Sequence, residues 1–278
     1  MQEKQYKNKL WGTFPRTCYI NRFMGSAFGE FGTEGIRTYL DESMLINPDM
    51  MVLFEWNEAN ENTYFQPSVN NGRCLERILN YYLQKLRGET FAGRPGDDPT
   101  VPNLIFSARK KLCLGETVHL ELLNVPDRNP GETYHAQLIL RDESGKTVAE
   151  FPEETFLKNE MKAVTYRLPS EQFNKNQILV PEIKAENKIY QGFGGIELHP
   201  TVCKEYKSVL TCLREQVPAV SEFQVTKKTD HTYAVKVAVH SATPLAGVEV
   251  LVDNEEVYAH DKTHEFDPEK YDVFRGML

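Results

Sequence analysis

Three glutamates lie close together in the segment that follows residue 54: Glu55, Glu58 and Glu61. Two carboxyl groups held near one another repel, so that one keeps its proton near neutral pH while the other stays ionised. Such a pair supplies one acid and one base, which is what the cleavage of a glycosidic bond requires. On spacing alone, a solvated acidic turn with an incidental tryptophan is the more common interpretation of such a segment.

Aromatic and amide side chains accompany these carboxylates. Sugar rings pack their C–H faces on aromatic rings, and their hydroxyl groups form hydrogen bonds with Asn and Glu side chains. This composition indicates a carbohydrate site, and its candidate substrate-binding residues are Trp56, Asn57, Asn62 and Tyr64.

The elements around this segment indicate α/β architecture. Residues 50–54 form a short continuous apolar run, which predicts a strand buried on both faces. One helix is predicted over 35–45 and a second over 75–86, where apolar residues recur at helical spacing until Gly88. The acidic segment therefore begins at the carboxyl end of a buried strand, where open sheets and βα-barrels assemble their active sites.

The order of residues in this segment resembles a known family. The pattern Trp-Asn-Glu-x-x-Glu-x-Thr-x-x-x-Pro starts at Trp56 and is followed by Gly72 and a helix from Arg73. It is similar to the last βα unit of the endo-α-mannosidase-like glycoside hydrolases (family 99), and the α-1,3-glucanase or mutanase-like enzymes (family 71) are related in pattern. The resemblance covers about residues 10–90.

That resemblance implies a (β/α)8 barrel with Glu58 as the general base and Glu61 as the general acid/base. The base would deprotonate the sugar 2-hydroxyl to give a 1,2-anhydro intermediate. Glu61 would protonate the leaving oxygen and later activate the water that opens the intermediate. No cofactor is implied, and we expect no metal site. Ala59 and Gln66 depart from the family pattern, and these differences bear on sugar and linkage specificity.

The rest of the chain follows a different period. Three prolines and two glycines indicate a linker over 93–102, after which apolar and polar residues alternate in short runs broken by turns. This pattern predicts an immunoglobulin-like β-sandwich over 103–205 and a partial second β-sandwich over 215–278. Candidate carbohydrate contacts on the surface of the sandwich are Tyr166, Tyr190 and Phe193, although core packing explains Tyr166 equally well. The alternative is that the sandwich modules are structural spacers.

The predicted fold class is therefore multidomain α/β plus all-β. Residues 1–92 would be the C-terminal piece of a (β/α)8 barrel, followed by the β-sandwich domains. One strand between two helices cannot cover both of its own faces, so we interpret the chain as a fragment of a longer protein, inactive in this form. The alternative is that residues 1–90 form a small helical cap on the sandwich.

Composition excludes several classes of protein. A net charge of −8, from 32 Lys plus Arg against 40 Asp plus Glu, disfavours nucleic-acid binding. No apolar stretch is long enough to span a membrane, and the N-terminus lacks the apolar core of a secretory signal. The family resemblance nevertheless favours an extracellular or periplasmic location. The five cysteines form neither a zinc-binding nor a disulfide pattern.

These observations together predict a glycoside hydrolase whose partner is a polysaccharide or glycan substrate. The alternative is a non-catalytic carbohydrate-binding or structural β-sandwich protein.

Overall fold

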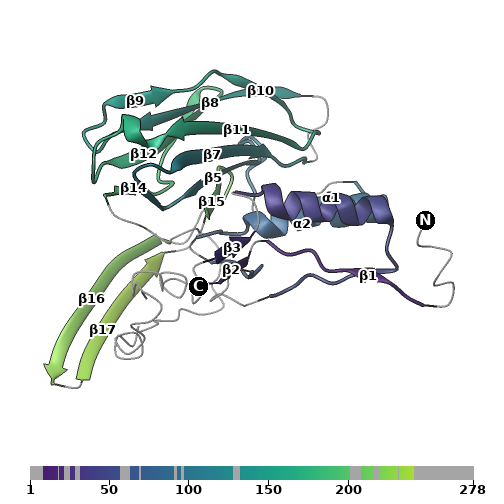
Figure 1. The fold of residues 1–278 in the computed structure, drawn as a ribbon, viewed down its shortest axis with the longest axis horizontal. Coiled ribbons are helices and arrows are strands. Elements are labelled where there is room, and N and C mark those ends of the chain that lie inside the picture. Colours follow the sequence, from purple (N-terminus) through teal and green to yellow (C-terminus); the bar gives the residue numbers. More distant parts are fainter. Residues whose placement is uncertain are drawn as a thin grey trace.

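The structure is a computed structural model of the whole chain. The residues that it describes are 9–17, 19–21, 26–28, 32–56, 63–68, 70–90, 93–94, 97–127, 132–200, 208–215, 219–230 and 232–240. Within them the chain is mostly β-strand with two α-helices (Figure 1). The β-rich part of the predicted fold class is confirmed, whereas the described residues form no closed barrel.

Both helices lie in the N-terminal part of the chain and match the helical spacing of the sequence. They are α1 (Glu34–Ile46) and α2 (Cys74–Arg87). Each ends at a residue in the left-handed conformation, Asn47 for α1 and Gly88 for α2. The Gly88 backbone N–H reaches two carbonyl oxygens of the last turn of α2, so the predicted glycine stop is confirmed.

Four short strands accompany the helices. β1 (Gly12–Thr13) pairs in parallel with β4 (Met50–Met51), and β2 (Tyr19–Asn21) pairs antiparallel with β3 (Ser26–Phe28). The parallel pair precedes the acidic segment, and α2 follows it.

Two larger sheets follow in the chain. The four-stranded sheet has the order β11-β7-β5-β15 and contains β5 (Leu104–Arg109), β7 (Thr117–Asn124), β11 (Lys162–Pro169) and β15 (Ser208–Cys212). The seven-stranded sheet has the order β10-β8-β12-β14-β6, with β13 beside β12 and β9 beside β8. Its strands are β6 (Lys111–Cys113), β8 (Thr133–Arg141), β9 (Thr147–Glu150), β10 (Glu154–Leu157), β12 (Ile178–Ala185), β13 (Lys188–Tyr190) and β14 (Ile196–His199). A short 3-10 helix, η2 (Ser170–Gln172), follows β11.

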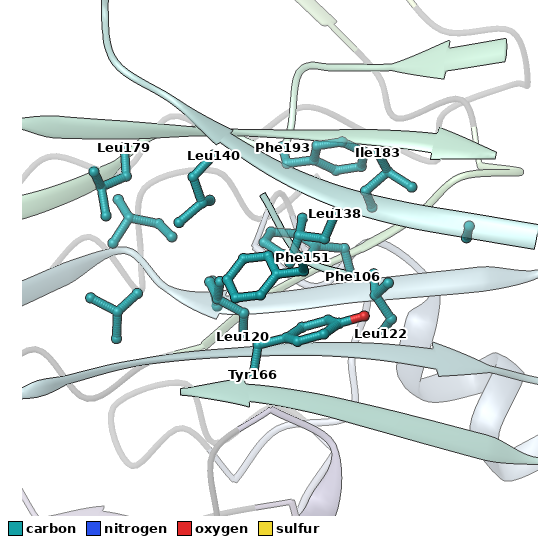
Figure 2. Packing of buried hydrophobic residues seen from close by; sticks show 14 of the residues in the cluster. Phe106, Leu120, Leu122, Leu138, Leu140, Phe151, Tyr166, Leu179, Ile183 and Phe193 are labelled. Atoms are coloured by element: carbon teal, nitrogen blue, oxygen red, sulfur yellow. The ribbon is translucent and has the colours of Figure 1, made fainter. Parts of the chain in front are cut away.

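The two sheets pack face to face around the larger hydrophobic core. Alternate residues of β7 contribute Leu120 and Leu122, and alternate residues of β8 contribute Leu138 and Leu140. Figure 2 shows these side chains meeting between the sheets, with the Tyr166 ring among them. The period-two pattern of the sequence therefore marks the inner faces of a β-sandwich, while the immunoglobulin-like topology stays a prediction.

The helices cover the outer face of the four-stranded sheet and form a third layer (Figure 1). A second core cluster joins residues of both helices, among them Ile36 and Ile78, to residues of the sheet, among them Ile105, Leu123 and Leu210. All six residues of β5 are buried for this reason, because the sheet has a covered layer on each side.

The last described element is a long hairpin of β16 (Ala219–Thr229) and β17 (Thr232–His240). The residues after it, 241–278, lie outside the described residues, so the partial second sandwich over 215–278 stays a prediction. The four-stranded sheet takes β15 from beyond the predicted boundary at 205, because that strand pairs with β5.

Candidate active site

The acidic segment, which we call the acid loop (residues 55–66), begins where the parallel strand pair ends. Beyond the two strands, the Val52 N–H donates to the Thr13 carbonyl oxygen at 2.9 Å, and the Phe54 N–H donates to the Pro15 carbonyl oxygen at 3.2 Å. The parallel pairing thus continues to residue 54. The acid loop follows the carboxyl end of a parallel strand, as its sequence predicts.

Hydrogen bonds close the acid loop at its base. The backbone N–H groups of Phe65 and Gln66 donate to the Trp56 carbonyl oxygen at 3.1 and 2.9 Å. The Thr63 hydroxyl donates to the Glu55 carboxylate at 2.9 Å. The two ends of the acid loop are therefore held side by side, and Glu55 belongs to its base.

The candidate residues of the acid loop separate into two groups. Glu58, Glu61, Asn57 and Asn62 lie outside the described residues, so their roles stay predictions. Trp56 is described and 56% exposed, which leaves its ring open to a ligand.

Tyr64 is placed differently from its predicted role. Its side chain is buried, and its hydroxyl lies 3.2 Å from the Ser68 hydroxyl. Thr63 and Phe65 on either side are also buried, because the base of the acid loop packs into the protein. In this structure the Tyr64 side chain packs inside the base of the acid loop, where its ring is not accessible to a sugar.

A turn that the sequence analysis did not single out connects the acid loop to α2. The Asn71 side chain accepts from the Ser68 N–H at 2.7 Å and donates to the Gln66 carbonyl oxygen at 3.3 Å. The Gly72 N–H closes the turn on the Ser68 carbonyl oxygen at 2.7 Å. The Asn-Asn-Gly sequence at residues 70–72 is the turn signal that could have identified it.

The strand predicted over 50–54 is not buried on both faces, and this prediction is wrong. Met50, Val52 and Phe54 are all exposed, and so is Phe14 beside β1. Met51 packs against the second core cluster, and Met50 and Leu53 line a pocket together with residues of both helices. The other exposed apolar residues of the strand pair are Phe14, Val52 and Phe54, and we call them the bare face.

The aromatic candidates on the sandwich belong mainly to its interior. Tyr166 and Phe193 are members of the larger core cluster, and Tyr190 packs against it. Burial raises the pKa of Tyr166 to about 12. The alternative of core packing therefore holds for Tyr166, and the prediction of a surface position for Phe193 is wrong because its ring is part of the core.

A buried ion-pair network lies between α2, residues 93–102 and the sandwich. Arg77 donates two hydrogen bonds to the Asp97 carboxylate at 2.7 and 2.8 Å, and Arg214 pairs with Asp127 at 2.6 Å. Burial acts to raise the pKa of Asp97, but the hydrogen bond and charge of Arg77 lower it overall. The segment predicted as a linker is thus fixed to α2 at its described residues.

The described residues also limit other kinds of site. They contain no group of three or more His, Cys, Asp or Glu side chains that could hold a metal ion. They also contain no helix whose length and apolar character would allow it to cross a membrane. Burial raises the pKa of the Cys74 thiol well above its ordinary value and also raises that of Cys212, so both thiols stay protonated at neutral pH.

Comparison with known proteins gives only partial structural overlap. No protein-family model and no curated protein matches the sequence. Two solved structures overlap with 41% of this chain, both of a β-glucosidase from Listeria innocua: one in complex with glucose, and a mutant form in complex with laminaribiose. Their TM-scores are 0.28 and 0.25, the sequence identity is 18% in each case, and the overlap spans 18% of each structure's chain. Superpositions with these scores do not establish a shared fold or a shared activity.

Proposed function

We propose that the acid loop belongs to the active site of a glycoside hydrolase that acts on a polysaccharide or glycan. One observation carries this proposal. A segment with an exposed tryptophan and two carboxylates three residues apart starts at the carboxyl end of a parallel strand and is closed at its base. Parallel α/β folds assemble their active sites at that edge.

The roles of the two carboxylates are those that the resemblance to the endo-α-mannosidase-like glycoside hydrolases implies. Glu58 acts as the general base and Glu61 as the general acid/base. Glu55 is not assigned a catalytic role, and its carboxylate accepts a hydrogen bond from Thr63 at the loop base. Asn57 and Asn62 hold sugar hydroxyl groups. The acid and the base both come from the chain itself, so the reaction needs no cofactor.

In this proposal residues 1–92 are the C-terminal part of a (β/α)8 barrel, and the sandwich begins at residue 103. The bare face supports it. Parallel strands are normally covered on both faces, and in a barrel the inner face is covered by the other strands. Val52 and Phe54 are exposed, whereas Met51 of the same strand packs against the core cluster that includes the helices, so one face of the strand has no cover among the described residues.

Glycan binding by the 278-residue chain is the first test. The sequence holds two tryptophans, so the Trp11→Phe variant leaves Trp56 as the only indole. Titration with α-linked manno- and gluco-oligosaccharides is expected to give a saturable change in its fluorescence. If no oligosaccharide changes the fluorescence and calorimetry shows no heat, the carbohydrate assignment is wrong.

Loss of the Trp56 ring is expected to weaken glycan binding at least about 10-fold, because a stacked ring contributes about 1.4 kcal/mol or more. The variant is Trp56→Ala, measured by calorimetry. Phe223→Ala is the matched control, since Phe223 is a similarly exposed aromatic residue on the β16–β17 hairpin. Glycan affinity that survives Trp56→Ala unchanged would favour the alternative of a carbohydrate-binding sandwich.

Hydrolysis is expected to depend on both carboxylates. The assay needs a form of the protein that hydrolyses the bound glycan, and it follows the release of reducing sugar. In that form, Glu58→Gln and Glu61→Gln are each expected to lower the rate of hydrolysis about 100-fold or more. Glu143→Gln, at an exposed turn of the sandwich, is the control and leaves the rate unchanged. Equal rates for the wild type and either active-site variant would remove that residue from the mechanism.

A further inference from the structure

Both helices have their N-terminus held by a carboxylate of the sandwich. The backbone N–H of Thr33, the first residue before α1, donates to Glu121 at 3.0 Å. The backbone N–H of Arg73, in the same position before α2, donates to both oxygens of Glu215 at 2.9 and 3.0 Å. Neither helix has a side-chain cap of its own. A negative charge at this end of a helix is favourable because it complements the helix dipole.

A glycine with positive φ precedes each of these capping contacts. Gly72 has a φ of 48°, and a Cβ atom there would lie 2.9 Å from the Glu215 carboxylate. Gly32 has a φ of 67°, and a Cβ atom there would lie 3.0 Å from the Glu121 carboxylate. Glycine thus permits both the backbone conformation and the close approach of the carboxylate.

The contact at Arg73 continues into the acid loop through the turn at residues 68–72. The Leu210 N–H of β15 donates to the Asn70 carbonyl oxygen at 2.7 Å, so the sandwich holds the turn at a second point. The Asn71 side chain then binds the Gln66 carbonyl oxygen, which is part of the loop base. These hydrogen bonds, together with the backbone between residues 70 and 73, connect the sandwich to the base of the acid loop.

Apolar packing follows the same path. Phe65, at the base of the acid loop, is 1% exposed and belongs to the second core cluster together with Leu210 and Cys212 of β15. Glu215 lies just beyond that strand and is itself mostly buried, 4.0 Å from Arg77. The base of the loop and the end of β15 are therefore parts of one packed unit.

We propose that Glu215 is a positioning residue for the acid loop, which makes the end of the β-sandwich part of the site. The role of the loop rests on the proposed function above. Glu215 touches no substrate in this proposal. It fixes the start of α2 and the turn before it, and the turn in turn fixes the loop base that carries Trp56 and precedes Glu58 and Glu61.

Hydrogen exchange of the 278-residue chain tests the positioning directly. In Glu215→Ala, the amides of Phe65 and Gln66 are expected to exchange at least about 10-fold faster than in the wild type, together with that of Arg73. Glu215→Gln keeps one oxygen acceptor for the Arg73 N–H but loses the negative charge, so it is expected to restore part of the protection. Glu143→Ala is the control for an exposed carboxylate and leaves all these amides unchanged.

Two further measurements keep the test decisive. Unchanged protection of the amides in β8 and β12 shows that the sandwich is folded. If Glu215→Ala does not fold, Glu215→Asp replaces it, because the shorter aspartate side chain loses the bidentate contact with Arg73. If only Arg73 and the first turn of α2 exchange faster while Phe65 and Gln66 keep their protection, Glu215 is a helix cap alone and the proposal is overturned.

Glycan binding separates this proposal from the proposed function. With Trp56 as the reporter, Glu215→Ala is expected to weaken affinity about 10-fold, and Glu215→Gln is expected to weaken it less than Glu215→Ala does. A wild-type chain that binds no glycan contradicts the hydrolase proposal, yet the exchange pattern still decides whether Glu215 positions the loop. A wild type and a Glu215→Ala variant that bind glycan equally well contradict the positioning role.

Discussion

A chain in which alanine replaces Glu121 is expected to lose about 3 kcal/mol or more of its free energy of unfolding. Glu121 is 2% exposed and accepts hydrogen bonds from the Thr33 N–H, from the Thr33 hydroxyl and from Arg37, the last at 2.8 Å. Alanine would leave the Arg37 guanidinium and the start of α1 without their acceptor. Urea unfolding followed by circular dichroism measures the change.

Two other substitutions serve as comparisons for Glu121→Ala. Glu121→Gln keeps the shape of the side chain but places an amide N–H₂ group near its donors, so an intermediate loss is expected. Glu143→Ala, at an exposed turn, should stay within about 0.5 kcal/mol of the wild type. A Glu121→Ala chain as stable as that control would show that apolar packing alone holds α1 on the sheet.

Glu121 also shows where sequence reasoning about the sandwich stops. The alternation around residues 118–122 correctly marks Leu120 and Leu122 as inner-face positions. The same alternation assigns Glu121 to the outer face, which in an isolated sandwich faces water. Here α1 covers that face, and Glu121 lies 88 positions from its partner Thr33. A local pattern holds no information about a layer that is contributed from so far away.

The strand over 50–54 fails for a related reason. Its apolar run is typical of a parallel strand with two covered faces, and the helices do cover one of them. The apolar run indicates that the strand needs cover on both faces, but it does not show which helices or strands would provide that cover. Within the described residues β4 pairs only with β1, so Met50, Val52 and Phe54 stay exposed.

The candidate site likewise combines features that are local in the sequence with features that depend on distant residues. Its chemistry is local in sequence, since Trp56, Glu58 and Glu61 lie within six residues, and sequence reasoning could therefore propose it. Its support is not local. The Glu215 carboxylate reaches the Arg73 N–H across 142 positions, and the two meet only because the helices lie on the sandwich.

Replacing Arg77 with methionine is expected to cost about 3–5 kcal/mol at pH 7, because it leaves a buried carboxylate without its main partner. The Arg77 side chain is 4% exposed and that of Asp97 is 11% exposed. Methionine fills similar space, so the loss reports the ion pair more than a cavity. Lys227→Met, which removes an exposed pair with Asp230, is the control and should change stability by less than about 1 kcal/mol.

The stability difference between the wild type and Arg77→Met is expected to depend on pH. In the wild type Arg77 lowers the pKa of Asp97, so the stability from the pair is present at neutral pH and is lost as the pH falls below the ordinary value of 3.8. In Arg77→Met, burial becomes the main influence and raises the pKa of Asp97, so stability falls as the pH rises. The difference between the wild type and the variant should therefore narrow between pH 7 and pH 4 in urea unfolding.

The double variant Arg77→Met with Asp97→Asn separates the charge from the packing. Because it removes the unpaired carboxylate, it is expected to recover part of the stability that Arg77→Met loses, and to show little dependence on pH over this range. Arg214, 4.0 Å from Asp97, limits the recovery because its own charge then loses a neighbour. A stability difference that stays constant with pH, and a double variant no more stable than Arg77→Met, would show that the Arg77–Asp97 pair does not hold residues 93–102 against α2.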